Sequence, residues 1–118
     1  MPTSVTDWHA RARSLAIHSQ AYIDGRYVPA ASGETFDCIS PIDGRLLARV
    51  AATDVPDADR AVAAARRAFE DGAWSRQPPR ERKRVLLRFA ELILQHRDEL
   101  ALLETLDMGK PIADSLAV

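Results

Sequence analysis

The sequence contains one cysteine among 118 residues, few aromatic residues, only five glycines and no long apolar run. A single cysteine, Cys38, excludes an internal disulfide framework and a metal site made of several thiolates. No apolar run approaches the roughly 20 residues that span a bilayer, and the first ten residues lack the apolar segment of a secretory signal. We therefore expect a cytoplasmic protein with no membrane partner.

An excess of charge of one sign is also missing. Lys and Arg number 16 and Asp and Glu number 17, so the net charge is −1. Basic side chains cluster over residues 80–88, but neither interleaved aromatic residues nor a known binding motif accompanies them. We therefore expect no nucleic-acid partner.

The composition is that of a globular protein, with 47% hydrophobic and 28% charged residues. Twenty of the apolar residues are alanine, and aromatic residues make up only 6%. The core that this chain builds alone is therefore predicted to contain few bulky side chains.

Two strand pairs are predicted after residue 20. Asp24-Gly25 separates two short β-rich runs and suits a type I′ turn, in which both central residues need a positive φ. A second pair is predicted over residues 35–39 and 45–51, with a left-handed Gly44 ending the turn between them. Leu46, Ala48 and Val50 are predicted to share one face of the later strand.

Helical periodicity dominates elsewhere. A short amphipathic helix or arm is predicted within residues 3–19, capped by Thr6 or Asp7. Asp54 is predicted to cap a longer helix that Gly72 ends. Its apolar stripe consists of Ala58, Ala61, Val62, Ala65, Ala68 and Phe69.

Pro78-Pro79 is predicted to open the next helix, with a break at Arg97-Asp98 where Asp98 would cap a second segment. The apolar row of these segments consists of Leu86, Phe89, Ile93, Leu100 and Leu103. His96 shares that row and is predicted to be a hydrogen-bonded core or boundary group. Gly109 and Pro111 form a helix stop, after which another helix begins.

The strands are early and few, and the helices have no complete sheet to cover. We therefore expect an α/β fold that is incomplete as a domain, the front part of a larger α/β domain that ends within a helix.

The residues suggest little chemistry. Cys38 lies within a predicted strand, away from any helix N-terminus or neighbouring cation, so a structural role is favoured over a reactive one. His9, His18 and His96 match no metal-ligand spacing. The sequence has neither a glycine-rich phosphate loop nor a nucleophile–base arrangement. We expect no catalytic and no cofactor-binding residue in this chain.

Four stretches, in this order, resemble the N-terminal part of the aldehyde dehydrogenase superfamily: residues 22–28, 36–44, 59–66 and 104–111. The last, Glu-Thr-Leu-Asp-Met-Gly-Lys-Pro, is the most specific. Trp8 with residues 14–17, and residues 110–112 with Ser115-Leu116, look most like the γ-glutamyl-γ-aminobutyraldehyde dehydrogenase branch, which acts in putrescine breakdown.

The resemblance implies that residues 21–118 are the N-terminal part of a Rossmann-like cofactor-binding domain, preceded by an arm or short helix over residues 1–20. It implies a homo-oligomeric enzyme that oxidises an aldehyde to a carboxylate with NAD or NADP. In such enzymes a thiolate attacks the aldehyde, hydride passes to the nicotinamide, and a Glu-activated water hydrolyses the thioester. The family's catalytic and cofactor-binding residues match no position here, so this chain alone is expected to be inactive, and Cys38 is not the nucleophile.

The resemblance also implies an alkali-cation site for Na+ or K+. The matching groups are the backbone carbonyls of Cys38 and Ile39 and the carboxylate of Asp107, all of them hard oxygen donors. The alternative is that Asp107 simply ends a helix.

Three interpretations of the chain follow. The first is an N-terminal piece of an aldehyde dehydrogenase. The second is a stand-alone interaction module that binds a partner through this segment. The third is a non-catalytic subunit that another chain completes.

Overall fold

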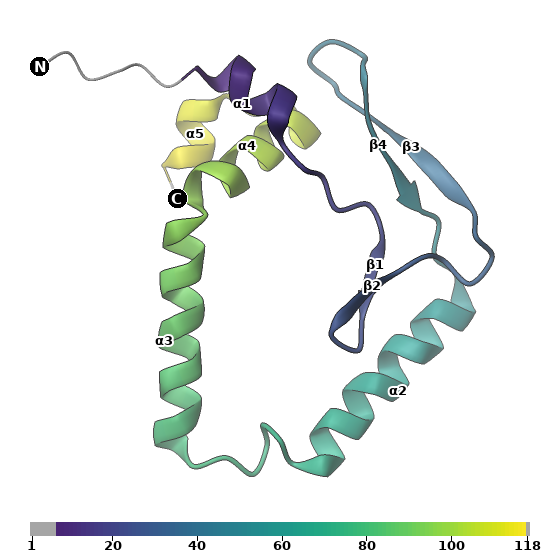
Figure 1. The fold of residues 1–118 in the computed structure, drawn as a ribbon, viewed down its shortest axis with the longest axis vertical. Helices are drawn as coiled ribbons and strands as arrows, with labels where there is room; N and C mark the ends of the chain where they lie inside the picture. The colour runs from purple at the N-terminus through teal and green to yellow at the C-terminus, as the bar shows by residue number, and fades with distance from the viewer. Residues whose placement is uncertain (1–6, 118) are drawn as a thin grey trace, which may run out of the picture.

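The computed structural model describes residues 7–117, in which two separate pairs of antiparallel strands are followed by helices. Helices α1, α4 and α5 gather at one end, and α2 and α3 run along opposite sides of the molecule (Figure 1). The elements are α1 (Trp8–Ser14), β1 (Ala21–Ile23), β2 (Arg26–Val28), β3 (Thr35–Ile39), β4 (Leu46–Ala51), α2 (Val55–Asp71), α3 (Pro79–Gln95), α4 (Arg97–Met108) and α5 (Ile112–Leu116). This arrangement confirms the predicted α/β class.

Helix α1 begins at the predicted cap. The Asp7 carboxylate accepts a hydrogen bond from the backbone N–H of Ala10 at 2.9 Å, which satisfies one of the free donors of the first turn. The other predicted cap, Thr6, lies outside the described residues. The helix is shorter than the pattern indicated, because Leu15 already has an extended ψ of 125°.

The β1–β2 hairpin turns through Asp24-Gly25, as predicted. Asp24 has a φ of 54° and Gly25 a φ of 77°, so both central residues take the left-handed conformation that a type I′ turn requires. Tyr27 on β2 stacks on the ring of His18, with centroids 4.4 Å apart. The segment before the hairpin is thereby held against it.

The β3–β4 pair contains a bulge that the sequence pattern did not reveal. Cys38 pairs with Ala48 but Ile39 pairs with Leu46, so Leu47 is the extra residue. A bulge interrupts the two-residue alternation of faces. Leu46 is consequently 48% exposed, and Leu47 takes its place beside Ala48 in lining a cavity. The prediction that Leu46 shares a face with Ala48 and Val50 is therefore wrong.

Helix α2 has the predicted start and end but packs through a different face. Asp54 caps it in a reciprocal capping box, and Gly72 ends it with a φ of 77°. Its buried residues are Asp57 and Ala64. Apart from the half-buried Ala61, the predicted stripe is exposed, and Val62 within it is 66% exposed. The periodicity indicated an apolar face but not which neighbour would cover it.

The break between α3 and α4 falls at His96, which has a φ of −99° and a ψ of 14°. Asp98 therefore lies within the first turn of α4 rather than at its cap. The His96 ring is hydrogen-bonded as predicted, with Nδ1 at 3.0 Å from a Glu99 oxygen. It is exposed rather than buried, as are most residues of the preceding helix α3, all of whose residues are described and none of which is buried.

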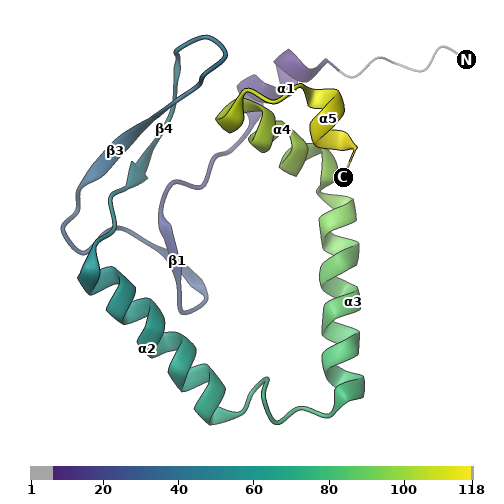
Figure 2. The same cartoon turned by 180° about the vertical axis from the view of Figure 1, so that it is seen from behind.

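The core is small and lies mainly where α4 meets α5. Ala101, Leu102 and Leu106 of α4 are buried, and buried Ser115 of α5 shares a hydrogen bond of 3.0 Å with Thr105. The view from behind shows α3 joining this end of the molecule to the α2 end (Figure 2). Among the helices of residues 7–117, we find none with the length and apolar character needed to cross a bilayer.

Candidate cation site and its surroundings

The helix stop of α4 lies directly against the turn between β3 and β4. Gly109 ends α4 with a φ of 74°. A Cβ atom at this glycine would lie 3.2 Å from Cγ of Pro41 in the β3–β4 turn, which is closer than ordinary van der Waals contact. Glycine thus permits both the left-handed cap and the close approach. The approach brings the last turn of α4 to the end of β3.

Cys38 and Asp107 meet at this junction. The Cys38 thiol donates a hydrogen bond to Oδ1 of Asp107 at 3.3 Å. This hydrogen bond, together with burial and the carboxylate charge, raises the pKa of the Cys38 thiol. The thiol is therefore held protonated, which is the opposite of what a nucleophilic cysteine needs. The structure supports the prediction that Cys38 is not reactive.

A cavity of about 330 Å³ opens beside this contact. Helix α4 supplies Glu104 and Asp107 to its wall, and β3 supplies Cys38. The remaining lining is apolar and comes from Ile17, Leu47, Ala48, Val50, Leu103, Leu106 and Met108. The cavity is thus a largely apolar pocket, with Cys38, Glu104 and Asp107 as the polar part of its lining.

Ile39, the third residue of the predicted cation site, does not line this cavity. Ile39 has a half-exposed side chain and is absent from the cavity wall; the prediction concerns its backbone carbonyl. Within residues 7–117 no group of three or more His, Cys, Asp or Glu side chains is arranged to hold a metal ion. A cation here would therefore depend on Asp107 and backbone oxygens, and the site remains a prediction.

Glu104 is the residue at this site that the sequence analysis missed. Its carboxylate lies in the cavity wall one helical turn from Asp107 and pairs with Lys110 at 3.0 Å. The i, i+3 spacing of the two acidic residues would have placed both on one face of the helix. Lys110 offsets the charge of Glu104, and Asp107 is the carboxylate that accepts the Cys38 hydrogen bond.

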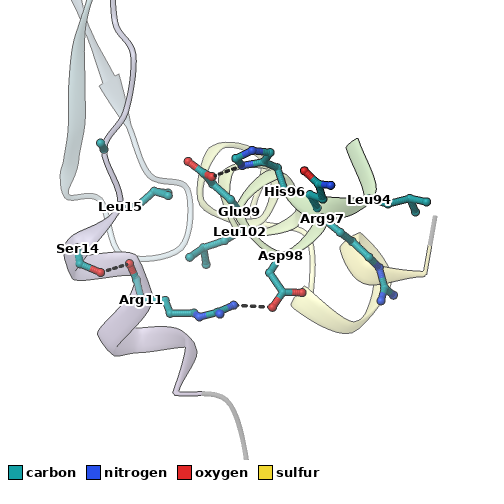
Figure 3. Close-up of a pocket in the computed structure, with 11 residues that line it drawn as sticks. Arg11, Ser14, Leu15, Leu94, His96, Arg97, Asp98, Glu99 and Leu102 are labelled. Carbon is teal, nitrogen blue, oxygen red and sulfur yellow. Dashed lines mark hydrogen bonds and ion pairs between the residues drawn. The ribbon is translucent and has the colours of Figure 1, made fainter. Parts of the chain in front are cut away.

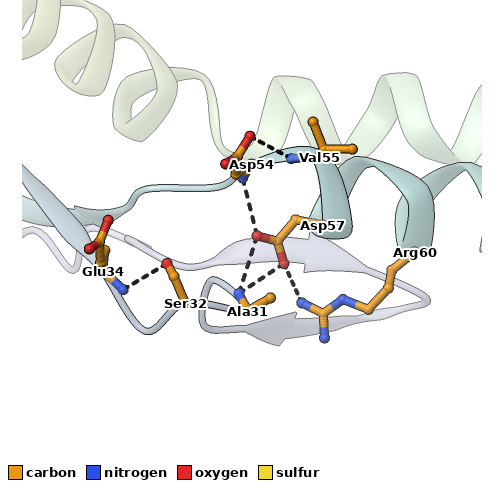
Figure 4. A network of polar contacts seen from close by, with 7 residues as sticks. All are labelled: Ala31, Ser32, Glu34, Asp54, Val55, Asp57 and Arg60. Atoms are coloured by element: carbon orange, nitrogen blue, oxygen red, sulfur yellow. Dashed lines mark hydrogen bonds and ion pairs between the residues drawn. The ribbon is translucent and has the colours of Figure 1, made fainter.

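Asp57 is the centre of a second polar network, which anchors the loop after β2 to the start of α2 (Figure 4). Its buried carboxylate accepts from the backbone N–H of Ala31 at 3.0 Å and of Asp54 at 3.2 Å, and pairs with Arg60. The Ala31 hydrogen bond is the main cause of a lowered Asp57 pKa, with Arg60 and Asp54 contributing and burial opposing. The Asp57 carboxylate is thus engaged by three partners within the protein, which indicates a structural role.

A larger cavity of about 710 Å³ lies between α1 and α4 (Figure 3). Arg11 pairs with Asp98 across it at 2.5 Å, and His96 pairs with Glu99 at its edge. The cations Arg11 and Arg97 in the lining balance the carboxylates Asp98 and Glu99, which leaves little net charge for a ligand. We interpret this cavity as space left between α1 and α4 where the two helices pack together.

The described residues provide no cradle for a dinucleotide. All five glycines have a positive φ and lie at turns, in a loop or at helix C-termini. A phosphate-binding loop instead places glycine before a helix N-terminus, where the free N–H groups point at the phosphate. The residues present therefore do not fit a nicotinamide cofactor by themselves.

Comparison with known proteins identifies the fold. A profile described as "Aldehyde dehydrogenase family" matches residues 27–117, which is most of the chain. The chain belongs to the aldehyde dehydrogenase family. This confirms the resemblance seen in the four sequence stretches.

Solved aldehyde dehydrogenases superimpose closely on the chain. A P. syringae indole-3-acetaldehyde dehydrogenase, in a structure with NAD+ and IAA, is 63% identical, with a TM-score of 0.93 over 95% of this chain and 23% of that one. A γ-glutamyl-γ-aminobutyraldehyde dehydrogenase from Burkholderia cenocepacia is 57% identical at the same TM-score, again over 95% of this chain and 23% of its own. Its name is that of the branch suggested by the sequence.

Among curated relatives, the aminoacetaldehyde dehydrogenase of Pseudomonas aeruginosa is 50% identical over 92% of this chain. The match covers 22% of that relative. The chain thus spans less than a quarter of the length of each of these three relatives.

Proposed function

We propose that the chain supplies the N-terminal part of an NAD(P)-dependent aldehyde dehydrogenase, an oxidoreductase that converts an aldehyde to a carboxylate. Residues 21–118 would form the N-terminal part of the cofactor-binding domain, and residues 1–20 an arm or short helix. The observation that carries the proposal is the 63% identity and TM-score of 0.93 to an aldehyde dehydrogenase whose structure contains NAD+.

The contribution of this chain to such an enzyme is structural. NAD or NADP, when bound by the complete enzyme, supplies the hydride acceptor. The residues described here supply strand pairs and covering helices, and their one thiol is held protonated by Asp107. By itself the chain should therefore turn over no aldehyde.

The proposed substrate class is an aminoaldehyde of putrescine breakdown. The names of the 57% and 50% identical relatives, a γ-glutamyl-γ-aminobutyraldehyde and an aminoacetaldehyde dehydrogenase, support an aldehyde that carries nitrogen. The proposal includes a cytoplasmic homo-oligomer.

A chimera tests the proposed function. This chain replaces the matching N-terminal segment of the P. syringae enzyme, and NAD+ reduction by an aldehyde is followed by absorbance. We expect the chimera to retain turnover and the isolated chain to have none. A folded chimera without turnover would contradict the proposal. Turnover by the isolated chain that disappears on Cys38→Ser would overturn the structural role of Cys38.

The alkali-cation site is proposed as part of the same function. Asp107 and the carbonyls of Cys38 and Ile39 would hold Na+ or K+. Support comes from the Cys38–Asp107 contact of 3.3 Å, which brings a hard carboxylate oxygen to the end of β3.

Thermal unfolding of the chimera in KCl, and in tetramethylammonium chloride of equal ionic strength, tests this site without relying on activity. We expect a higher unfolding midpoint in KCl that Asp107→Ala abolishes and Asp59→Ala, at an exposed position on α2, leaves intact. Equal midpoints in both salts would show that Asp107 only ends its helix.

A further inference from the structure

Helix α2 has apolar residues on two opposite sides, and only one side is covered. The covered side carries Asp57 and Ala64, which are buried. The opposite side carries Val55 and Val62, each 66% exposed, and Phe69, 64% exposed. These three residues are spaced seven apart, which places them in one row along the helix. A helix with two apolar sides is typical of a position between two layers.

Helix α3 is even less covered, since all of its residues are described and none is buried. Its main apolar row consists of Val85, Leu86, Phe89, Leu92 and Ile93. A second row lies on another side, where Leu87 is 56% and Leu94 is 71% exposed. The remaining side is polar and carries Arg84, Arg88 and Glu91, with an Arg88–Glu91 ion pair at 3.1 Å. The helix thus has one side suited to water and two suited to burial.

The excess of exposed surface indicates how large an area another polypeptide would bury. The chain exposes 9196 Å², whereas a compact protein of 13.0 kDa exposes about 6,300 Å². The excess of about 2,900 Å² far exceeds the ~800 Å² that one partner contributes to a standard interface. The radius of gyration of 18.1 Å likewise exceeds the value of about 13.5 Å for a compact chain of this length.

The comparison structures indicate which polypeptide packs on this surface. The backbone matches enzymes of which it spans 23% with a TM-score of 0.93, so its open frame has the geometry of a segment embedded in a larger fold. A second copy joined by a two-fold axis would cover one patch on each chain. The exposed rows belong to α2 and α3, which lie on opposite sides of the molecule (Figure 1), so one such patch would leave several of them in water.

We propose that a polypeptide carrying the downstream three quarters of an aldehyde dehydrogenase covers the exposed rows of both α2 and α3, and that it binds even when it is not covalently joined to the chain. The proposal rests on the proposed function and adds to it that packing alone holds the two parts together.

The test uses the chimera with a specific protease site placed directly after this chain. The chimera folds as one polypeptide, is cleaved, and is then passed over a size-exclusion column with light scattering. We expect the two parts to co-elute in equal numbers after cleavage. Separation of the two parts in native buffer would overturn the proposal. If the parts separate but the uncleaved chimera turns over aldehyde, the proposed function still holds.

Matched variants identify the surface. Leu86→Gln with Phe89→Gln should weaken association of the cleaved parts about tenfold or more, because each removes a large apolar side chain from the interface. Arg84→Gln with Arg88→Gln, on the polar side of the same helix, should leave it unchanged. Both pairs lie at exposed positions, so circular dichroism of the isolated chain should show the same helicity for each. Equal weakening by the two pairs would contradict the assigned surface.

The alternative partner for this surface is a second copy of the chain. If the isolated chain forms a stable dimer that Leu86→Gln with Phe89→Gln dissociates, and the cleaved parts exchange into that dimer, the surface is a self-association interface and the proposal is wrong. A chain that does not form this dimer, together with cleaved parts that stay joined, supports it.

Discussion

The thiol of Cys38 on β3 donates a hydrogen bond to Asp107 on α4, across 69 positions of sequence. The pairing joins the strand pair to the helical end of the molecule. It also places the only thiol of the chain against a negative charge. The same contact therefore holds the candidate cation ligand in place and suppresses the reactivity of the cysteine.

Removing the carboxylate should activate Cys38. In Asp107→Ala the thiol loses the acceptor and the negative charge that raise its pKa, so the pKa should fall toward its ordinary value near 8.5. The pH dependence of alkylation by iodoacetamide should shift to lower pH. Asp37→Ala is the control, because this strand neighbour points to the other face and pairs with Arg49. An unshifted profile for Asp107→Ala would refute the coupling.

Asp57 should make the stability of the chain depend on acidity. Its folded pKa is lowered, chiefly by the Ala31 hydrogen bond. It therefore contributes stability above the unfolded pKa of about 3.9, and this contribution is lost as the pH falls through the lower folded value. Between pH 7 and pH 3, Asp57→Asn should flatten the decline of the unfolding midpoint, whereas Asp59→Asn, at an exposed site on the same helix, should not. Parallel curves for the two variants would contradict this.

Gly25→Val should destabilise the β1–β2 hairpin. The residue has a φ of 77°, and the left-handed conformation costs a residue with a Cβ about 1–2 kcal/mol, with β-branching adding to the strain. Chemical denaturation should show the loss. Asp24→Asn is the control, because Asn tolerates the positive φ at that position. If Gly25→Val is as stable as the parent chain, the turn is not type I′.

Gly109→Ala should be more damaging than Gly33→Ala. Both glycines have similar φ values, 74° and 75°, but only a Cβ at Gly109 meets a neighbour, Cγ of Pro41 at 3.2 Å. Both variants should lose about 1 kcal/mol or more from the backbone. Gly109→Ala should in addition move the end of α4 away from β3, which faster alkylation of Cys38 would reveal. Equal losses and unchanged alkylation would show that the close approach is not needed.

The local features of this protein were predictable from its sequence. The Asp24-Gly25 turn, the Asp54 cap and the Gly72 and Gly109 helix ends were all predicted correctly, because each depends on residues within a few positions of one another and on the limited range of φ that each residue allows. The family was predictable for a similar reason, since four short stretches carry it.

Tertiary structure decided which surfaces meet. Periodicity indicated an apolar stripe through Val62 but could not show that the opposite face, at Ala64, is the one packed. Likewise, the bulge at Leu47 and the exposure of His96 depend on what lies beside them. The Cys38–Asp107 contact depends on how a strand pair and a distant helix stop are brought together. Burial is a property of pairs of elements, and no pattern within one element states what its neighbour is.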